Sequence, residues 1–190
     1  MLASDLRAAL GRDLEPEPRL DLGPGERAAA VLALLVERPE RSIVFTERAA
    51  TLRRHAGEIS FPGGLTEPED GSLAETALRE AHEEIGLDPA SPVVLGALPA
   101  VPTFVSGIVV APFVGVVEEL PTLWPADGEI ARVLIVPVAA LLAAEREVAW
   151  VRPGGAGWTG WVYEVNGGTI WGATARMLHD LLRLVRGAVA

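Results

Sequence analysis

Runs of apolar residues, separated by polar stretches rich in glycine and proline, predict most of the strands in this chain. The expected strands are residues 28–36, 41–46, 93–98, 108–117 and 133–136, followed by a hairpin of residues 147–151 and 161–165. Pro112 lies inside the fourth run. Because proline has no backbone N–H, its position predicts a sheet edge or a bulge.

Helices are expected where apolar residues recur at helical spacing or where capping residues delimit a segment. They are residues 3–11, 72–86, 138–144 and 173–185. The second is the most clearly bounded, since Ser72 and Glu75 form a capping box and Gly86 fits a left-handed C-cap. Strands interleaved with helices indicate an α/β fold. We expect one domain over residues 26–190, preceded by an N-terminal helix and a connecting loop over residues 1–25.

The helix that begins after Ser72 carries an acidic face. Glu80, Glu83 and Glu84 lie at i, i+3 and i+4, so their carboxylates project from one side. Like charges at this spacing repel each other, which indicates a bound cation, and oxygen ligands favour Mg2+ or Mn2+ held together with substrate phosphates. The alternative is a solvent-exposed acidic face on which Arg79 pairs with Glu83. The opposite, apolar face consists of Ala74, Leu78, Ala81 and Ile85.

A basic segment, residues 47–60, lies between the second strand and this helix. Its basic residues are Arg48, Arg53, Arg54 and His55. They are either solvent-exposed side chains between elements or a clamp for phosphate groups, which the forked guanidinium group suits. Gly57 would let a ligand approach the backbone closely. We favour the clamp because the segment leads directly into Phe61–Gly64 and the acidic helix.

The glycine turn and the helix together resemble the Nudix box, a glycine followed by an Arg-Glu-apolar-any-Glu-Glu-any-Gly-apolar run. The matching residues are Gly64, Arg79, Glu80, Glu83, Glu84, Gly86 and Leu87. In the first half of the box, Asp70 stands where the pattern has glutamate, and eight residues separate it from Arg79, one more than usual. The resemblance implies a Nudix fold, with a mixed β-sheet between α-helices.

A second motif resembles the signature of the coenzyme A pyrophosphatase branch of the Nudix superfamily. It spans residues 46–64, and residues 170–175 resemble another segment of that branch. The resemblance implies hydrolysis of the diphosphate bond of coenzyme A and its derivatives, giving 3',5'-adenosine bisphosphate and 4'-phosphopantetheine, with Mg2+ or Mn2+ as cofactor. The residues that it assigns to substrate binding are Arg48, Arg53, Gly57, Phe61, Gly63 and Gly64.

The resemblance also implies roles for the acidic residues. Glu80 and Glu84, one helical turn apart, would be the main metal ligands, with Glu83 as a third ligand or acting through water. An acid of this cluster or of a downstream loop would deprotonate the attacking water. The loop candidates are Glu118, Glu119, Asp127 and Glu129. Glu129 resembles the acid that precedes a strand in many family members, so we add it to the candidate catalytic residues.

The composition of the chain limits which kinds of binding partner and which cellular compartment we expect. A net charge of −10 argues against general binding to nucleic acid or membranes, and no apolar run is long enough to span a bilayer. The absence of cysteine and of a signal peptide fits a cytoplasmic protein, expected as a monomer or homodimer. Three alternatives stay open: a Nudix enzyme acting on ADP-ribose or NADH, a non-catalytic nucleotide-binding regulator, and a purely structural acidic domain.

Overall fold

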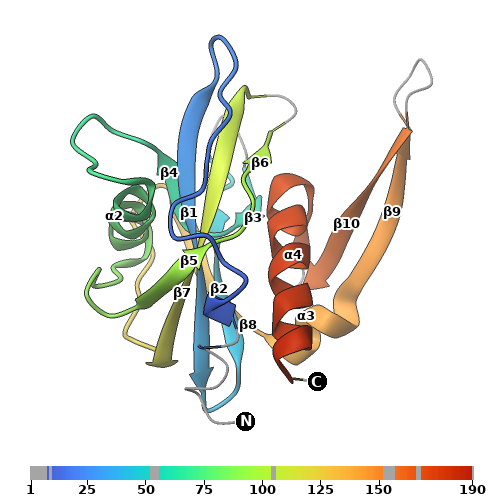
Figure 1. Cartoon of the computed structure of the whole chain (residues 1–190). Coiled ribbons are helices and arrows are strands. Elements are labelled where there is room, and N and C mark those ends of the chain that lie inside the picture. Colours follow the sequence, from blue (N-terminus) through green and yellow to red (C-terminus); the bar gives the residue numbers. More distant parts are fainter. Residues whose placement is uncertain are drawn as a thin grey trace.

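The computed structural model describes residues 8, 10–51, 56–103, 106–151, 157–165 and 168–189. A large mixed sheet separates one helix from a second layer of helices and strands, which confirms the expected mixed sheet between helices (Figure 1). The large sheet contains β1 (Arg27–Arg38), β2 (Ser42–Arg48), β3 (Ile59–Ser60), β4 (Gly63–Leu65), β5 (Val93–Ala97), β6 (Val101–Pro102), β7 (Ile108–Glu119) and β8 (Ile130–Pro137). The other elements are α2 (Leu73–Ile85), α3 (Val138–Ala144), β9 (Glu145–Val151), β10 (Gly157–Val165), β11 (Gly168–Ile170) and α4 (Gly172–Val189).

Strand β1 runs through the middle of the large sheet and has different neighbours at its two ends. On one side it pairs in parallel with β7 along almost its whole length. On the other side, Leu35 and Val36 pair with the start of β2, whereas Ala29 to Val31 pair with β4. Strands β1 and β2 therefore diverge from their shared turn, and β3 and β4 occupy the space between them.

The continuous apolar run of β1 is explained by burial on both faces of the sheet, as expected of a parallel pair. Alternate side chains enter two separate cores. Ala30, Leu32 and Leu34 belong to the core beneath α2, and Val31 and Leu35 belong to the core shared with α3, α4 and β10. Figure 1 shows these two layers on opposite sides of the sheet. Strand β1 thus fixes the position of α2 relative to the rest of the molecule.

Helix α2 begins and ends where the sequence predicts. The hydroxyl oxygen of Ser72 accepts a hydrogen bond from the Glu75 N–H at 3.2 Å, and Gly86 adopts a left-handed conformation with φ 66°. The carboxylate of Glu75 accepts from the Gly71 N–H at 2.8 Å, one residue before the position of an ideal capping box. Ala81 and Ile85 are buried as expected. These caps determine where α2 begins and ends, and so which residues form its acidic face.

The expected edge position of Pro112 is wrong. This residue pairs with Val31 inside the β1–β7 ladder, in the middle of the sheet. On the opposite side, β7 pairs with β5 as far as Phe113 and with β6 from Val110, so Pro112 lies opposite the break between β5 and β6. The Leu98 N–H donates to the Pro112 carbonyl across this break at 2.9 Å. The absent N–H of Pro112 points to the same side and interrupts no strand pairing in the described sheet.

The second layer is a three-stranded sheet covered by α4. Glu145, at the start of β9, links β10 and α4 through its side-chain contacts. The Glu145 carboxylate accepts hydrogen bonds from the Tyr163 hydroxyl at 2.9 Å and from Arg186, and it contacts His179 Nδ1 at 2.8 Å. Burial raises the pKa of Glu145, but these three partners outweigh it and hold the pKa below its ordinary value. The β9–β10 hairpin and α3 are confirmed, whereas β11 was not expected.

The segment before β1 packs into the structure although it lacks regular pairing over most of its length. Leu10 and Leu14 are buried in the core that contains α4, and Glu15 forms a two-hydrogen-bond bridge with Ala97 of β5. Of the helix expected over residues 3–11, residues 8, 10 and 11 are helical, and the others lie outside the described residues. The segment therefore covers an edge of the large sheet.

Truncating Leu10 is expected to destabilise the fold. Its side chain is 1% exposed, so Leu10→Ala should lower the free energy of unfolding by about 2–4 kcal/mol through lost burial and a residual cavity. Urea unfolding at constant pH measures the change. Leu22→Ala is the matched control, because Leu22 is 44% exposed and its truncation should cost less than about 0.5 kcal/mol. Equal losses in the two variants would show that the N-terminal segment does not contribute to the core.

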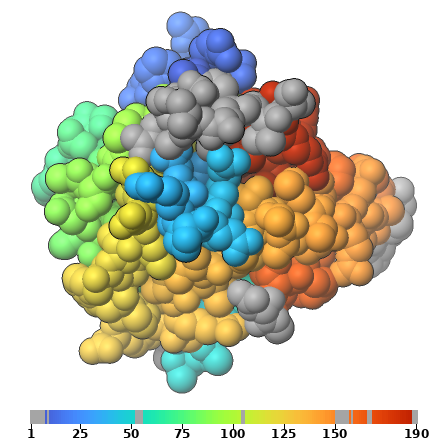
Figure 2. All heavy atoms as spheres, turned by 90° about the horizontal axis from the view of Figure 1, so that it is seen from below, coloured from blue at the N-terminus to red at the C-terminus, as the bar shows by residue number. Residues whose placement is uncertain are grey.

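The turn that joins β1 to β2 lies at the end of the sheet opposite Gly63 and Gly64. Figure 2 shows this underside, with the turn in light blue, α3 in orange and α4 in red. A hollow of about 490 Å³ opens beside it, lined by Glu40, Arg41, Val138, Ala139, Leu142, Val185 and Arg186. No candidate site residue lines this hollow, so we assign it no part in the chemistry.

None of the helices in the described ranges is both long and apolar enough to cross a membrane.

Candidate active site

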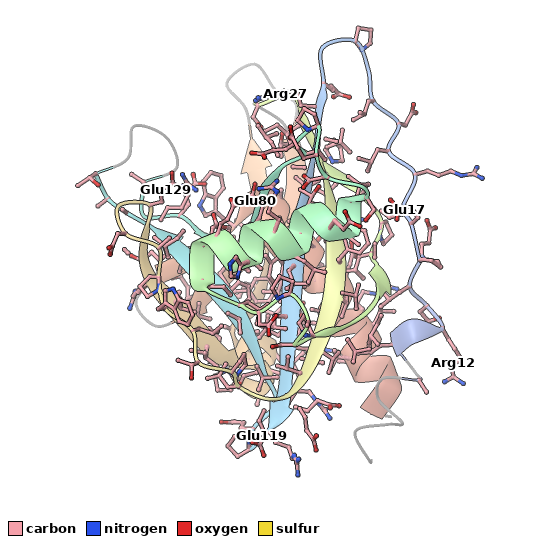
Figure 3. The ribbon with its side chains drawn as sticks, turned by 90° about the vertical axis from the view of Figure 1, so that its left-hand side faces the viewer. Arg12, Glu17, Arg27, Glu80, Glu119 and Glu129 are labelled. Atoms are coloured by element: carbon pink, nitrogen blue, oxygen red, sulfur yellow. The ribbon has the colours of Figure 1, made fainter. Side chains whose placement is uncertain are left out.

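The candidate site lies where α2 crosses the divergence of β1 and β2. Gly63 and Gly64 approach α2 from the sheet, Arg48 approaches it from the end of β2, and the loop before β8 reaches it from the third side. Figure 3 shows Glu80 on the upper side of α2 and Glu129 on that same side, near the start of β8. Segments that are far apart in the sequence therefore meet around the acids of α2.

Glu84 is the most buried of the three candidate metal-binding glutamates, with 8% of its surface exposed. The Gly63 N–H donates to its Oε2 at 3.2 Å, and Arg48 Nη1 lies 3.9 Å from its Oε1. Burial raises the pKa of Glu84 to about 7, and the charges of Glu80 and Glu129 add to the rise, whereas Gly63 and Arg48 oppose it. The Glu84 carboxyl therefore ionises less readily than an exposed glutamate even with Arg48 nearby, and a further positive charge would favour its charged form.

Glu80 lies against the backbone of Gly64, one helical turn before Glu84. A Cβ at residue 64 would come within 2.4 Å of Glu80 Oε1, so glycine is required for the carboxylate to occupy this place. Burial raises the pKa of Glu80, and Arg79 partly offsets that rise. A Cβ at Gly63 would likewise come within 2.4 Å of the Ala30 carbonyl oxygen. The two glycines thus orient the acids of α2, and the Gly63 N–H already has Glu84 as its acceptor.

Arg79 connects the acids of the site, and Asp70 orients it. Arg79 Nε donates to Asp70 Oδ1 at 2.9 Å and its Nη2 donates to Oδ2 at 3.1 Å, while the Thr76 hydroxyl donates to the same oxygen at 2.8 Å. The hydrogen bonds from Arg79 hold the pKa of Asp70 well below its usual range, although burial opposes them. Arg79 Nη1 donates to Glu80 Oε1 at 3.0 Å and to Glu83 Oε2 at 3.2 Å. Asp70, unexplained by the motif spacing, therefore positions Arg79.

The donor set suits a divalent cation, although the carboxylates are not gathered into a finished metal site. Within the described residues, no group of three or more Asp, Glu or His side chains has a metal-binding arrangement. Glu83 is half-exposed and pairs with Arg79, whereas Glu84 faces Gly63. Glu80 and Glu84 suit a divalent cation chemically, because both are oxygen donors whose charged forms are disfavoured by burial and would be favoured by a bound positive charge. The metal-ligand roles of Glu80, Glu83 and Glu84 remain predictions.

The four loop acids that the sequence offers as candidates for catalysis lie in different places in the structure. Glu118 and Glu119 end β7 and pair with Arg38, and Figure 3 shows Glu119 at the opposite end of the sheet from Glu80. Asp127 is exposed in the β7–β8 loop. Glu129 is also exposed, and its charge is near enough to Glu84 to contribute to the raised pKa of that residue. Of the four, Glu129 has the best position for a role in catalysis, which is still a prediction.

Apart from the two glycines of β4, the candidate substrate-binding residues are Arg48, Gly57, Phe61 and Arg53. Arg48 reaches the site, and its Nε is buried without a hydrogen-bond partner in the part of the chain that the structure describes. Gly57 has a positive φ of 71°, and its N–H donates to the Arg48 carbonyl at 3.1 Å. This hydrogen bond brings the two ends of the basic segment together. Phe61 is buried and stacks on Phe45 with ring centroids 4.9 Å apart, so it contributes to the core, and its role in substrate binding is still a prediction. Arg53 lies outside the described residues.

Trp124 was not anticipated from the sequence. Its indole ring lies against Gly86, because a Cβ at that glycine would come within 2.2 Å of ring atom Cε2. A single tryptophan in a loop between proline residues has no periodicity and no motif around it, so only the three-dimensional structure relates it to α2. Gly86 therefore serves both the left-handed cap and the close approach of this ring.

Comparison with known proteins agrees with this geometry. The family model of the NUDIX domain matches residues 26–155. A relative from Salmonella paratyphi B, described as uncharacterized Nudix hydrolase NudL, is 40% identical over 162 residues, which cover 82% of this chain and 81% of the relative. A NudL of the same description from Photorhabdus laumondii is 35% identical over 172 residues, covering 90% and 91% of the two chains. The chain therefore belongs to the Nudix hydrolase family.

Solved structures share the fold at low sequence identity. The NUDIX domain of Shewanella oneidensis NrtR, solved in complex with ADP ribose, superposes with a TM-score of 0.58 at 14% identity, and the match covers 100% of both chains. A MutT/nudix family protein from Enterococcus faecalis gives a TM-score of 0.55 at 13% identity, over 100% of this chain and 75% of the other. These likenesses concern the fold and leave the substrate of this chain to be argued from its own residues.

Proposed function

We propose that this Nudix hydrolase cleaves the diphosphate bond of coenzyme A and its derivatives, releasing 3',5'-adenosine bisphosphate and 4'-phosphopantetheine or its acylated form. The observation that carries the proposal is the position of Arg48. This arginine belongs to the signature segment of residues 46–64, and its guanidinium group faces the buried carboxyl of Glu84 with a buried, unpartnered Nε among the described residues. A guanidinium group held beside the metal-binding acids suits a phosphate oxygen of the substrate.

The residues take distinct roles in this proposal. Glu80 and Glu84 would hold the divalent cation, Mg2+ or Mn2+, with Glu83 as a third ligand or acting through water. When bound, the cation would neutralise charge on the diphosphate and lower the pKa of water beside it. Arg79 keeps Glu80 oriented through the contact at 3.0 Å, and Arg48 binds a phosphate oxygen. The Glu129 carboxylate accepts the proton of the attacking water.

Product analysis tests the proposed substrate. The purified chain is incubated with coenzyme A and Mg2+ or Mn2+, and the products are identified by mass spectrometry, with ADP-ribose and NADH in parallel reactions. We expect 3',5'-adenosine bisphosphate and 4'-phosphopantetheine to appear with coenzyme A, at a kcat/KM well above those for the other two diphosphates. Preferred cleavage of ADP-ribose or NADH would replace the substrate assignment, and binding without turnover would support the non-catalytic regulator.

Arg53 is proposed to recognise the 3'-phosphate of coenzyme A. Arg53→Ala should therefore raise KM for coenzyme A by about tenfold, as expected for one lost charged contact, and leave KM for dephospho-coenzyme A nearly unchanged. Steady-state kinetics with both substrates measures the difference. Arg12→Ala is the control, because Figure 3 shows Arg12 far from Glu80. Equal increases in KM for the two substrates would remove Arg53 from the 3'-phosphate site.

A further inference from the structure

The β7–β8 loop is attached to the C-terminal end of α2 by its backbone. The Trp124 N–H donates to the Ile85 carbonyl at 3.1 Å, and the Ala126 N–H donates to the Glu84 carbonyl at 2.9 Å. These carbonyls belong to the last turn of α2, where no intrahelical donor is available to satisfy them. The loop is therefore bound to two carbonyl groups that α2 leaves without a helical donor. One of these carbonyls belongs to Glu84.

The side chain of Trp124 adds an apolar contact to this attachment. The indole lies against the bare Cα of Gly86, although 56% of the Trp124 surface remains exposed to solvent. An aromatic ring stabilises a contact through the apolar area that it buries, so the indole helps to hold the loop against the helix. A smaller residue at position 124 would lose this apolar contact.

The same loop is held at its other end by the signature segment. The Ala49 N–H, next to Arg48, donates to the Glu129 carbonyl at 2.8 Å, and the Ile130 N–H donates to the Ala126 carbonyl at 3.3 Å. Residues 124–129 therefore bridge the end of α2 and the start of the basic segment. The position of Glu129 relative to Glu84 follows from this bridge, since both of its ends are fixed by backbone hydrogen bonds.

We propose that Trp124 is a positioning residue that sets the distance between the Glu129 carboxylate and the acids of α2 by holding the β7–β8 loop against Gly86. In this role Trp124 acts through the loop and not as a ligand of substrate or metal. The proposal rests on the function proposed above, because it assigns Trp124 an effect on turnover that acts through Glu129. A displacement of about 1 Å in a catalytic group is enough to lower turnover by up to about a hundredfold.

A double-mutant cycle tests this coupling. We expect Trp124→Ala to lower kcat by about tenfold or more, with KM within about twofold of the wild type and with a thermal unfolding curve that shows a folded protein. In a Glu129→Gln background, the same substitution should lower kcat by less than about twofold, because the residue through which it acts is already lost. Trp124→Phe should retain most of the activity, since a phenyl ring still covers Gly86. Leu120→Ala, at an exposed position of the same loop, should have no effect.

The outcomes separate the inference from the proposed substrate. Equal loss of kcat from Trp124→Ala in both backgrounds would mean that the residue acts by another route, and an increase in KM alone would mean that the indole binds substrate; each overturns the inference. If Trp124→Ala does not fold, the cycle is run with Trp124→Leu, which removes the ring and keeps an apolar side chain. If the wild type cleaves another diphosphate and not coenzyme A, the substrate proposal fails and the cycle is measured on that diphosphate. A wild type without turnover on any of them overturns both.

Discussion

Replacing Glu84 with glutamine is expected to lower kcat by about a thousandfold or more while the fold stays intact. Glutamine has the same shape and can still accept the hydrogen bond that the Gly63 N–H donates at 3.2 Å. It carries no charge, so it binds a divalent cation much more weakly than the carboxylate does. Steady-state turnover with saturating Mg2+ or Mn2+ gives the change in kcat, and circular dichroism reports whether the fold is kept.

The same substitution should change stability in a direction that identifies the cause. In the folded protein the pKa of Glu84 is raised to about 7, above its ordinary value of 4.5. The protonated group therefore contributes its full stability below pH 4.5, and this contribution is lost as the pH rises through about 7. In a chelator at pH 8, Glu84→Gln should therefore unfold at a higher temperature than the wild type. Added Mg2+ should raise the Tm of the wild type and leave that of the variant nearly unchanged.

Glu75→Gln provides the matched control for both measurements. Glu75 lies on the same helix, is exposed, and is not a predicted metal ligand. Its amide can replace the carboxylate that accepts from the Gly71 N–H, so neither kcat nor the response to Mg2+ should change. A Glu84→Gln enzyme with normal turnover, or one whose Tm still rises with Mg2+ as in the wild type, would show that the cation is held by other residues.

Features set by local sequence were predictable from the chain alone. Ser72 and Gly86 bound α2 because capping depends on residues within one turn of the helix end. The long apolar run of β1 identified a buried strand because burial on both faces removes any alternation with polar residues. The position of Glu80, Glu83 and Glu84 on one helix followed from the helical repeat alone. Their surroundings, by contrast, depend on segments far away in the sequence.

Features set by distant pairing were missed or misjudged for one physical reason. Strands β3 and β11 contain two and three residues, too few for a periodic signal, and they exist because β2 and β10 offer them partners. Pro112 fits a central strand only because β5 and β6 leave a break opposite it. The stacking of Phe61 on Phe45 likewise depends on a residue of β2 that lies 16 positions away in the sequence. None of these partners is specified by residues nearby in the sequence.

The second large effect concerns the pair formed by Arg79 and Asp70, which the motif spacing alone did not explain. Arg79→Met should lower the free energy of unfolding at pH 7 by about 3 kcal/mol, because the Asp70 side chain is only 7% exposed and would lose its charged partner. The methionine keeps much of the apolar stem, so the loss reports the charge and its hydrogen bonds. Urea unfolding at pH 7 measures it.

A pH series and a second substitution separate this explanation from a simple packing defect. In the wild type the pKa of Asp70 is depressed below 3.8, so its stabilising contribution is present above that value and is lost as the pH falls further. In Arg79→Met the buried carboxyl has no cation beside it, its pKa rises, and protonation relieves the cost, so the deficit should narrow as the pH falls from 7 towards 4. Adding Asp70→Asn to Arg79→Met should recover part of the loss at pH 7, since no buried charge then remains. A deficit that is independent of pH, with no recovery in the double variant, would mean that Arg79 stabilises α2 through its contacts with the Leu65 carbonyl and the neighbouring glutamates instead.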